Sequence, residues 1–316
     1  MTSYPVLEVG GTHARACRID TTTWHAMPGT IYRLPLDSSG SADAIIATMI
    51  ACADALYLTP AETLAVAIPG PFDYDAGIAR FEGVGKFDNL AGVDLSRTLL
   101  DGLAQPPLQV AFVNDADAFG LGEWFAGSAH GYQRAVAITL GTGVGSAFVD
   151  AGRIVSSGPS VPPDGDVYRL AVRGRPLEET VSRRAIIAAY RNLAPSSRTF
   201  SGDVRDIAAA ALSGDRIAAG VFAQAFRLLG EAMAPWLMRF RAQVLVVGGG
   251  LSASWALIQG PMRTGLGETA DEIVMVKSAD TENAIAAGAV WHSLRVLAPT
   301  DDPDIARAAG PSAGDL

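Results

Sequence analysis

Two stretches of this chain repeat a pattern that suits phosphate binding. Residues Val6–Asp20 and Val136–Asp150 each contain an apolar strand, a Gly-Thr turn, a second apolar strand and a closing Asp. Such a turn presents backbone N–H groups and a threonine hydroxyl with no bulky side chain in the way. One copy would be weak evidence, because hairpins use glycine anyway. Two copies in matched contexts predict a nucleotide held between two related domains.

Asn114 and Asp115 follow a second kind of pattern, in which polar residues end an apolar strand and begin a helix. Asn and Asp are favoured N-cap residues, so a purely structural role is one interpretation. In a chain with two phosphate-type turns, a carboxylate at the carboxyl end of a strand, facing an interdomain cleft, also suits a general base. Both interpretations stay open at this point.

The elements that must position these residues alternate between strands and helices, which indicates an α/β fold. Strands are expected at 5–10, 14–19, 63–68, 109–113, 134–140, 144–149, 243–247 and 272–276. Helices are expected at 42–56, 94–104, 116–126, 178–193, 203–213, 217–240, 252–265 and 281–296. We predict a small N-terminal domain of residues 1–113 plus 283–297, a large domain of 114–282, and a flexible tail of 298–316.

The composition limits the function classes. The chain has 316 residues, 49% of them hydrophobic, and a formal charge of −9, which argues against a nucleic-acid partner. Cys17 and Cys52 lie in apolar segments and are expected to be buried thiols of a reducing compartment. The N-terminus leads directly into a strand, and no uninterrupted apolar run is long enough to span a membrane. These features predict a cytoplasmic protein that does not contact a membrane.

Six short motifs together resemble the ROK family of sugar kinases, repressors and open-reading-frame products, which belongs to the hexokinase–actin superfold. In chain order they are Glu8-x-Gly-Gly-Thr12, Ile68–Pro71, Asn114-Asp115-Ala116, Leu140–Gly145, Gly248–Gly250 and Ala286–Ala289. The resemblance covers about residues 1–297. It implies a two-domain, ribonuclease H-like fold with an interdomain cleft, and a homodimer. It also implies ATP and Mg²⁺, with phosphate transferred to a hexose hydroxyl, usually on carbon 6.

The resemblance also implies a role for each matching residue. Asp115 would accept the proton of the sugar hydroxyl, and Glu8 would contact magnesium directly or through a water molecule. The sugar would be bound by Gly70, Asn89, Asn114, Asp115, Asp166 and Glu178. The nucleotide would be bound by Gly10, Gly11, Thr12, His13, Gly141, Thr142, Gly143, Gly248, Gly249 and Gly250.

The chain departs from the family pattern at three places. The first motif begins with Glu8 where the family has Asp. The segment Pro162–Glu178, where the family carries a zinc motif, has neither Cys nor His, so zinc is not expected. The family's Glu-x-Gly-His, which contacts the sugar, is replaced by Pro163-Asp164-Gly165-Asp166. Glu178 matches the next family element, although it could also be an exposed glutamate in the first turn of a helix.

Three functions fit these motifs: an ATP-dependent hexose kinase, a sugar-responsive repressor and a catalytically weak sugar or nucleotide sensor. A repressor is disfavoured because only Met1–Pro5 precede the first strand and the charge is acidic. Glucose is the default substrate. A carboxylate can pair with a substrate ammonium, which makes an amino sugar a second candidate. The acidic, zinc-free loop also resembles that of kanosamine kinases. Alternatively, both aspartates are solvated loop residues.

Overall fold

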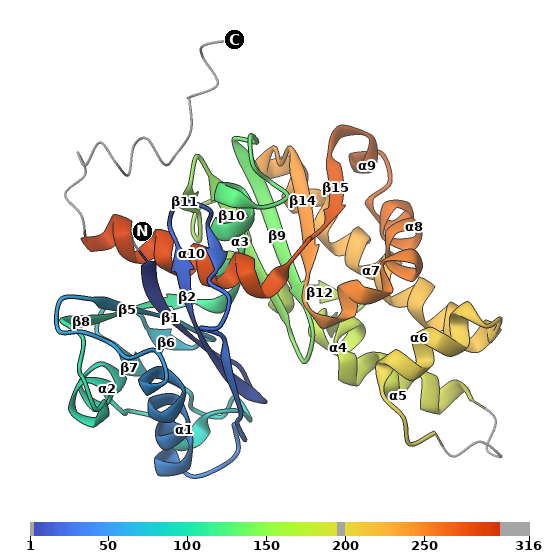
Figure 1. Ribbon diagram of the computed structural model, residues 1–316. Coiled ribbons are helices and arrows are strands. Elements are labelled where there is room, and N and C mark those ends of the chain that lie inside the picture. The colour runs from blue at the N-terminus through green and yellow to red at the C-terminus, as the bar shows by residue number, and fades with distance from the viewer. Residues whose placement is uncertain (1–2, 195–199, 298–316) are drawn as a thin grey trace. The chain divides into compact units, whose positions relative to one another are not determined.

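The computed structural model describes residues 3–194 and 200–297, which divide into two compact units (Figure 1). Unit 1 contains the described residues up to Ala126 together with those from Glu282 onward, and unit 2 contains Gly127–Thr281. The sequence placed this boundary between residues 113 and 114, one helix earlier. Helix α3 (Asp115–Ala126) lies in unit 1. The tail at 298–316 is outside the described residues.

The sheet of unit 1 has the strand order β3-β2-β1-β5-β8, and β4 also pairs with β2. β1 and β2 are antiparallel, whereas β1 pairs with β5, and β5 with β8, in parallel. The central strands are almost continuously buried, as expected for a sheet that is covered on both faces. The bounds are β1 (Ser3–Val9), β2 (His13–Asp20), β3 (His25–Ala26), β4 (Tyr32–Pro35), β5 (Thr63–Ile68) and β8 (Gln109–Asn114).

Helices α1 (Ala42–Asp54) and α2 (Leu95–Gly102) belong to unit 1. Each begins at a side-chain cap: Ser41 accepts from the backbone of Ala44, and Asp94 from that of Arg97. The remaining short elements are β6 (Phe72–Asp73), β7 (Ile78–Ala79) and η1 (Asp88–Leu90).

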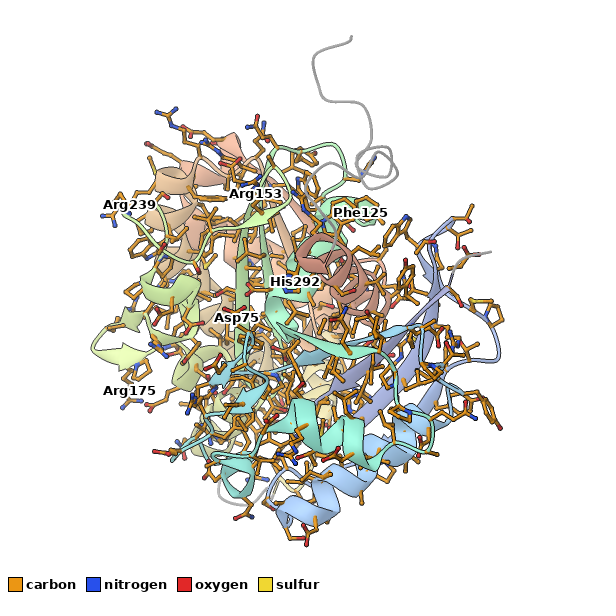
Figure 2. The ribbon with its side chains drawn as sticks, turned by 90° about the vertical axis from the view of Figure 1, so that its left-hand side faces the viewer. Asp75, Phe125, Arg153, Arg175, Arg239 and His292 are labelled. Carbon is orange, nitrogen blue, oxygen red and sulfur yellow. The ribbon has the colours of Figure 1, made fainter. Side chains whose placement is uncertain are left out.

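The last helix, α10 (Thr281–Leu297), packs very closely on α3. A Cβ added to Gly122 would lie 1.8 Å from the carbonyl oxygen of Ala284, and one added to Gly288 would lie 1.8 Å from that of Ala118. Only glycine permits this approach. At the end of α3, Phe125 (labelled in Figure 2) stacks on Trp291 of α10 with ring centroids 4.2 Å apart. These contacts explain why α3 and α10 belong to the same unit.

The sheet of unit 2 repeats the pairing pattern of unit 1. Its order is β11-β10-β9-β14-β15, with β9 and β10 antiparallel and with β9, β14 and β15 mutually parallel. The duplicated turns of the sequence therefore belong to duplicated arrangements of a hairpin followed by parallel strands. The bounds are β9 (Arg134–Leu140), β10 (Val144–Asp150), β11 (Arg153–Ile154), β14 (Val244–Gly248) and β15 (Val274–Lys277).

The predicted helix at 178–193 is interrupted in unit 2. Ser182 has extended backbone, and its side chain accepts from the backbone N–H of Ala185, so a new helix begins there. The helices are α4 (Glu178–Val181), α5 (Arg183–Leu193), α6 (Val204–Leu212), α7 (Arg216–Phe240), α8 (Trp255–Leu266) and α9 (Thr269–Glu272). The short elements are η2 (Pro163–Gly165), η3 (Val167–Arg169), β12 (Ala171–Val172), β13 (Arg175–Pro176) and η4 (Gly250–Ser254).

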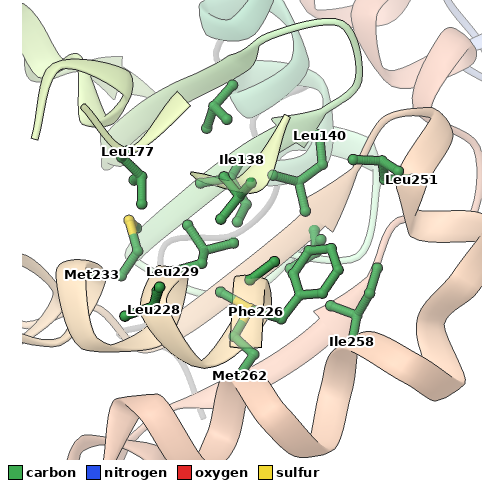
Figure 3. Close-up of a cluster of buried hydrophobic side chains, with 14 of the residues drawn as sticks. Ile138, Leu140, Leu177, Phe226, Leu228, Leu229, Met233, Leu251, Ile258 and Met262 are labelled. Atoms are coloured by element: carbon green, nitrogen blue, oxygen red, sulfur yellow. The ribbon is translucent and has the colours of Figure 1, made fainter. Parts of the chain in front are cut away.

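Helix α7 supplies much of the core of unit 2. Phe226, Leu229 and Met233 are fully buried beside Ile138 of β9 and Met262 of α8 (Figure 3). Among the described helices, α7 alone has the length and composition that a membrane span requires. Half of its most apolar window is buried, so the core accounts for its apolar character.

Candidate active site

The first glycine turn connects β1 to β2 in unit 1. The carbonyl oxygen of Gly11 accepts from the backbone of Ser38 (3.3 Å), and that of Thr12 accepts from Leu36 (3.0 Å). Within the described residues, the amides of Gly11 and Thr12 have no protein acceptor. Unpaired backbone amides in a tight turn are what an anionic phosphate requires. The pKa of His13 is lowered by burial and then by the nearby Arg33, which favours a neutral imidazole beside the turn.

The second glycine turn connects β9 to β10 in unit 2. The amide of Gly141 donates to the carbonyl oxygen of Gly143 (3.0 Å), which closes the turn. The carbonyl oxygen of Gly141 accepts from the backbone of Arg183 (2.9 Å), so the turn is also tied to the first residue of α5. In this part of the structure the amides of Thr142 and Gly143 have no protein acceptor. Each unit therefore offers one turn with two free amides.

Glu178 lies against this second turn. A Cβ added to Gly143 would be 3.3 Å from Oε1 of Glu178, so a larger residue at 143 would displace the carboxylate. Glu178 is the first residue of α4 and is half-buried, which differs from an exposed glutamate in the first turn of a helix. Its contact with a sugar stays a prediction.

The glycine run Gly248–Gly250 follows β14 and contains one position with a strict requirement for glycine. Gly249 has φ +83° and ψ 173°, and an added Cβ would lie 2.4 Å from the carbonyl oxygen of Leu140. Its amide donates to the hydroxyl of Thr281 (3.1 Å). Gly249 thus lets the loop pass closely over the end of β9, whereas Gly250 has open space around it. A contact with adenosine stays a prediction.

Asn114 has the structural role that the sequence left open. Its Oδ1 accepts from the backbone of Ala116 (2.8 Å) and Asp117 (3.2 Å), which caps α3. Its Nδ2 donates to the hydroxyl of Tyr74 (2.9 Å), which in turn donates to the carbonyl oxygen of Ile68 (3.3 Å). These bonds fix the start of α3 and therefore the residue that follows, Asp115.

Asp115 is the strongest candidate for a general base. Its Oδ1 accepts from the backbone of Ala116 (2.9 Å). Burial raises the pKa of this carboxyl, and the ammonium of Lys86 opposes the rise. A carboxylate with a raised pKa is a better proton acceptor near neutral pH than an ordinary aspartate. Lys86 was not among the predicted site residues.

The other two predicted sugar residues of unit 1 lie in different surroundings. A Cβ added to Gly70 would be 3.3 Å from the Tyr74 hydroxyl and 3.7 Å from Nδ2 of Asn114, so Gly70 is adjacent to the capped end of β8. Asn89 is exposed, and its Nδ2 donates to the carbonyl oxygens of Ser39 (3.3 Å) and Gly40 (2.8 Å). Tyr74 is a site residue that sequence reasoning missed.

Glu8 is paired inside the protein. Arg15, only 4% exposed, donates to its carboxylate and also lies 3.5 Å from Glu282. Burial raises the pKa of Glu8 to about 7, although Arg15 opposes the rise. A magnesium ligand should be an open, ionised carboxylate, so Glu8 fits a direct contact poorly. Its contact with magnesium stays a prediction. The sequence missed Arg15, yet Glu8 and Arg15 are cross-strand partners in the first hairpin.

The acidic loop of unit 2 contains its own counter-charge. Arg169 lies 3.0 Å from Oδ2 of Asp164 and 3.4 Å from Oδ2 of Asp166. Burial raises the pKa of Asp166, and Arg169 opposes the rise. The buried hydroxyl of Ser146 donates to the carbonyl oxygen of Gly165 (2.7 Å) and accepts from Val167 (3.0 Å), which holds the loop on β10. Among the described residues no group of three His, Cys, Asp or Glu side chains is arranged for a metal.

Comparisons with known proteins agree with this architecture. The model of the ROK family matches residues 4–292. The glucokinase of Thermotoga maritima is 29% identical over 214 residues, covering 62% of this chain and 66% of that enzyme, just under two thirds of its length.

Two solved structures show the same fold. The glucokinase of Parabacteroides distasonis superposes with a TM-score of 0.73 and 22% identity, covering 93% of this chain and 98% of that one. A ROK family glucokinase of Streptomyces griseus, solved with glucose and AMPPNP, superposes with a TM-score of 0.71 and 19% identity. The match covers 91% of this chain and 98% of that one. The predicted hexokinase/actin-like fold is confirmed. The family match extends over nearly the whole chain, and the protein is a member of the ROK family.

Proposed function

We propose that this chain is an ATP-dependent sugar kinase that transfers the γ-phosphate of ATP to the 6-hydroxyl of a hexose or amino-hexose. The observation that carries the proposal is Asp115, a half-buried carboxylate at the junction of β8 and α3 whose pKa is raised by desolvation. It lies in the same unit as a glycine turn whose amides are free for phosphate. The chain's membership of a family that includes glucokinases supports the same chemistry.

The proposed reaction assigns one step to each group. The oxygen of the 6-hydroxyl attacks the γ-phosphorus, its bond to phosphorus forms, and the bond to the β,γ-bridging oxygen breaks to release ADP. Asp115 accepts the hydroxyl proton. In unit 1 the free amides of Gly11 and Thr12 are proposed to donate to phosphate oxygens, and the amides of Thr142 and Gly143 are the equivalent donors of unit 2. When bound with the nucleotide, Mg²⁺ would supply neutralisation of the phosphate charge.

Asn114 is a positioning residue in this scheme. Because its amide caps α3 and bonds to Tyr74, it fixes the backbone from which Asp115 projects. Sugar contacts by Gly70, Asn89, Asn114, Asp166 and Glu178, and nucleotide contacts by His13 and Gly248–Gly250, are part of the proposal.

The acidic loop bears on which sugar is the substrate. The carboxylates of Asp164 and Asp166 could receive the ammonium of an amino-hexose such as kanosamine. Both already pair with Arg169, so a substrate ammonium must compete with an internal cation. We therefore propose glucose as the first substrate to test and kanosamine as the second.

The test is ADP release from ATP and Mg²⁺ with glucose, glucosamine, kanosamine and N-acetylmannosamine, with each product identified by mass spectrometry and ³¹P NMR. Formation of a hexose 6-phosphate from at least one sugar supports the proposal. If every sugar leaves ATP hydrolysis at its sugar-free rate, the kinase proposal fails.

A sugar- or nucleotide-binding regulator with weak catalysis is the second candidate. The observation in its favour is the pairing of Glu8 with Arg15, which removes a carboxylate from magnesium binding. Calorimetric titration separates the two: a regulator binds sugar or AMPPNP without turnover. We also propose a homodimer and a cytoplasmic location, which the family resemblance implies. Analytical sedimentation tests the oligomeric state.

A further inference from the structure

The positive charges of this chain come almost entirely from arginine. The sequence has 22 arginines and 2 lysines, Lys86 and Lys277. Arginines such as Arg153, Arg175 and Arg239 extend outward from the surface of unit 2 (Figure 2). Lys277 is exposed at the end of β15, whereas Lys86 is half-buried on a loop of unit 1. A half-buried lysine in such a chain calls for a physical explanation.

The loop that carries Lys86 is rigidly built. The carboxylate of Asp88 accepts from the backbone of Val84 (3.0 Å) and Gly85 (3.1 and 3.2 Å), which fixes the turn before Lys86. Phe87 is fully buried and packs on Phe81 with ring centroids 5.2 Å apart. Lys86 therefore projects from a backbone that is held on both sides.

The same loop is connected to the first glycine turn. The amide of Phe87 donates to the carbonyl oxygen of Ser38 (2.7 Å), and the amide of Ser38 donates to the carbonyl oxygen of Gly11 (3.3 Å). Asn89 adds bonds to Ser39 and Gly40 of the intervening loop. Two hydrogen bonds thus separate the residue after Lys86 from the turn proposed to hold phosphate.

Lys86 also acts on the proposed base. Its ammonium opposes the rise that burial causes in the pKa of Asp115. Within the described residues no salt bridge joins Lys86 to Asp115, so the ammonium remains available to a second anion. The loop that carries this cation is therefore hydrogen-bonded, through Ser38, to the phosphate turn, and its charge acts on the carboxylate that would accept the hydroxyl proton.

We propose that Lys86 is a catalytic residue that donates hydrogen bonds to the phosphoryl group as it passes from ATP to the sugar. The inference rests on the proposed kinase function and adds a residue to it. Lys86 keeps its protons throughout, while Asp115 takes the proton of the hydroxyl. Its charge offsets the negative charge on the equatorial phosphoryl oxygens, which a compact ammonium can approach closely.

Three variants test the role: Lys86→Met, Lys86→Arg and, as the control, Lys277→Met. Removing one preorganised donor to the transferred group should lower kcat by roughly 10²–10³-fold. KM for sugar and ATP should change far less. Lys86→Arg should recover part of the loss, and Lys277→Met should match the parent.

The pH profile distinguishes catalysis from a structural effect. Because Lys86 lowers the pKa of Asp115, its removal should shift the acidic limb of kcat/KM to higher pH. Lys277→Met should leave that limb unchanged.

The scarcity of lysine permits a test on the unmutated protein. Acetylation followed by peptide mass spectrometry reports Lys86 and Lys277 separately. Glucose with AMPPNP should protect Lys86 at least several-fold and leave Lys277 unaffected. The role of Lys86 is overturned if its labelling is equal with and without ligands, or if Lys86→Met keeps a kcat within twofold of an active parent. Either result leaves the proposed kinase function standing. A parent that phosphorylates no sugar overturns the proposed function, and this inference with it. If Lys86→Met does not fold, Lys86→Arg and the labelling decide.

Discussion

Glu8 and Arg15 face each other across the β1–β2 hairpin, and their buried side chains form an ion pair next to the Gly10–Thr12 turn. A second pair in unit 1 makes a useful contrast. Arg18 donates to both carboxylate oxygens of Glu62, at 2.6 and 3.2 Å, closer to the surface. Burial dominates at Glu8 and raises its pKa to about 7. At Glu62 burial also favours a rise, but hydrogen bonds from Arg18 and Thr59 outweigh it and lower the pKa.

These two carboxyls should therefore affect stability with opposite dependence on pH. The native state holds the Glu8 proton more tightly than the unfolded state does. The contribution of Glu8 to the free energy of unfolding therefore falls as pH rises from about 4.5 to about 7. Glu8→Gln should gain stability relative to the parent over that interval. Glu62 contributes above its unfolded pKa, so the cost of Glu62→Gln should shrink as pH falls below about 4.5. Urea unfolding from about pH 3 to about pH 8 measures both effects, and parallel curves for the two variants would contradict the account.

Arg169 should control how strongly the acidic loop favours an amino sugar over glucose. Arg169→Met leaves Asp164 and Asp166 without their cation, so a substrate ammonium no longer has a competitor. The ratio of kcat/KM for kanosamine to that for glucose should rise roughly tenfold. The control is Arg173→Met, since Arg173 is exposed and pairs with Glu231 instead. The loop does not contact the sugar's amine if both variants keep the parent's ratio.

The glycine run after β14 should tolerate substitution at one position and not at the next. Gly249→Ala would place a Cβ 2.4 Å from the carbonyl oxygen of Leu140 in a backbone region that favours glycine, and Gly250→Ala meets open space. The backbone strain should cost about 1–3 kcal/mol, with a similar amount from overlap. Denaturant unfolding of the pair measures the difference. Equal stabilities would mean that the close approach of this loop to β9 is not required.

Metal chelation should show that the enzyme requires magnesium and does not require zinc. EDTA should stop turnover, and excess Mg²⁺ should restore it, because the nucleotide is bound as its magnesium complex. A zinc-selective chelator should affect neither activity nor melting temperature, since Pro162–Glu178 contains no Cys or His. Stoichiometric, tightly bound zinc in the purified protein would refute the second half of this prediction.

Much of the fold followed from local patterns in the sequence. The long strands and helices lie within a few residues of their expected ranges, because each has a strong apolar period and polar flanks. The two-residue strands, such as β6 and β7, have no such period and were missed. The break at Ser182 was also missed, although a serine inside a helical pattern is a potential cap.

Long-range relationships could be predicted less well. The domain boundary depends on Gly122 and Gly288 meeting across α3 and α10, which no local window of sequence contains. Lys86 acts electrostatically on Asp115 from a loop fixed by Ser38 and Asp88, so its role depends on tertiary contacts. By contrast, the pairing of Glu8 with Arg15 could have been predicted, because the Gly10–Thr12 turn sets the register of the hairpin.

The most direct test of the account is the turnover of Asp115→Asn compared with the parent, at pH 7 with ATP, Mg²⁺ and the best sugar. The control is Asp101→Asn, at an exposed aspartate of α2. Calorimetry on the same samples measures sugar binding, which the amide should largely preserve because it keeps the shape of the carboxylate. We predict a fall in kcat of about 10²–10⁴-fold for Asp115→Asn, with no change for Asp101→Asn. An Asp115→Asn enzyme that turns over at near the parental rate would contradict the assignment of Asp115 as the general base.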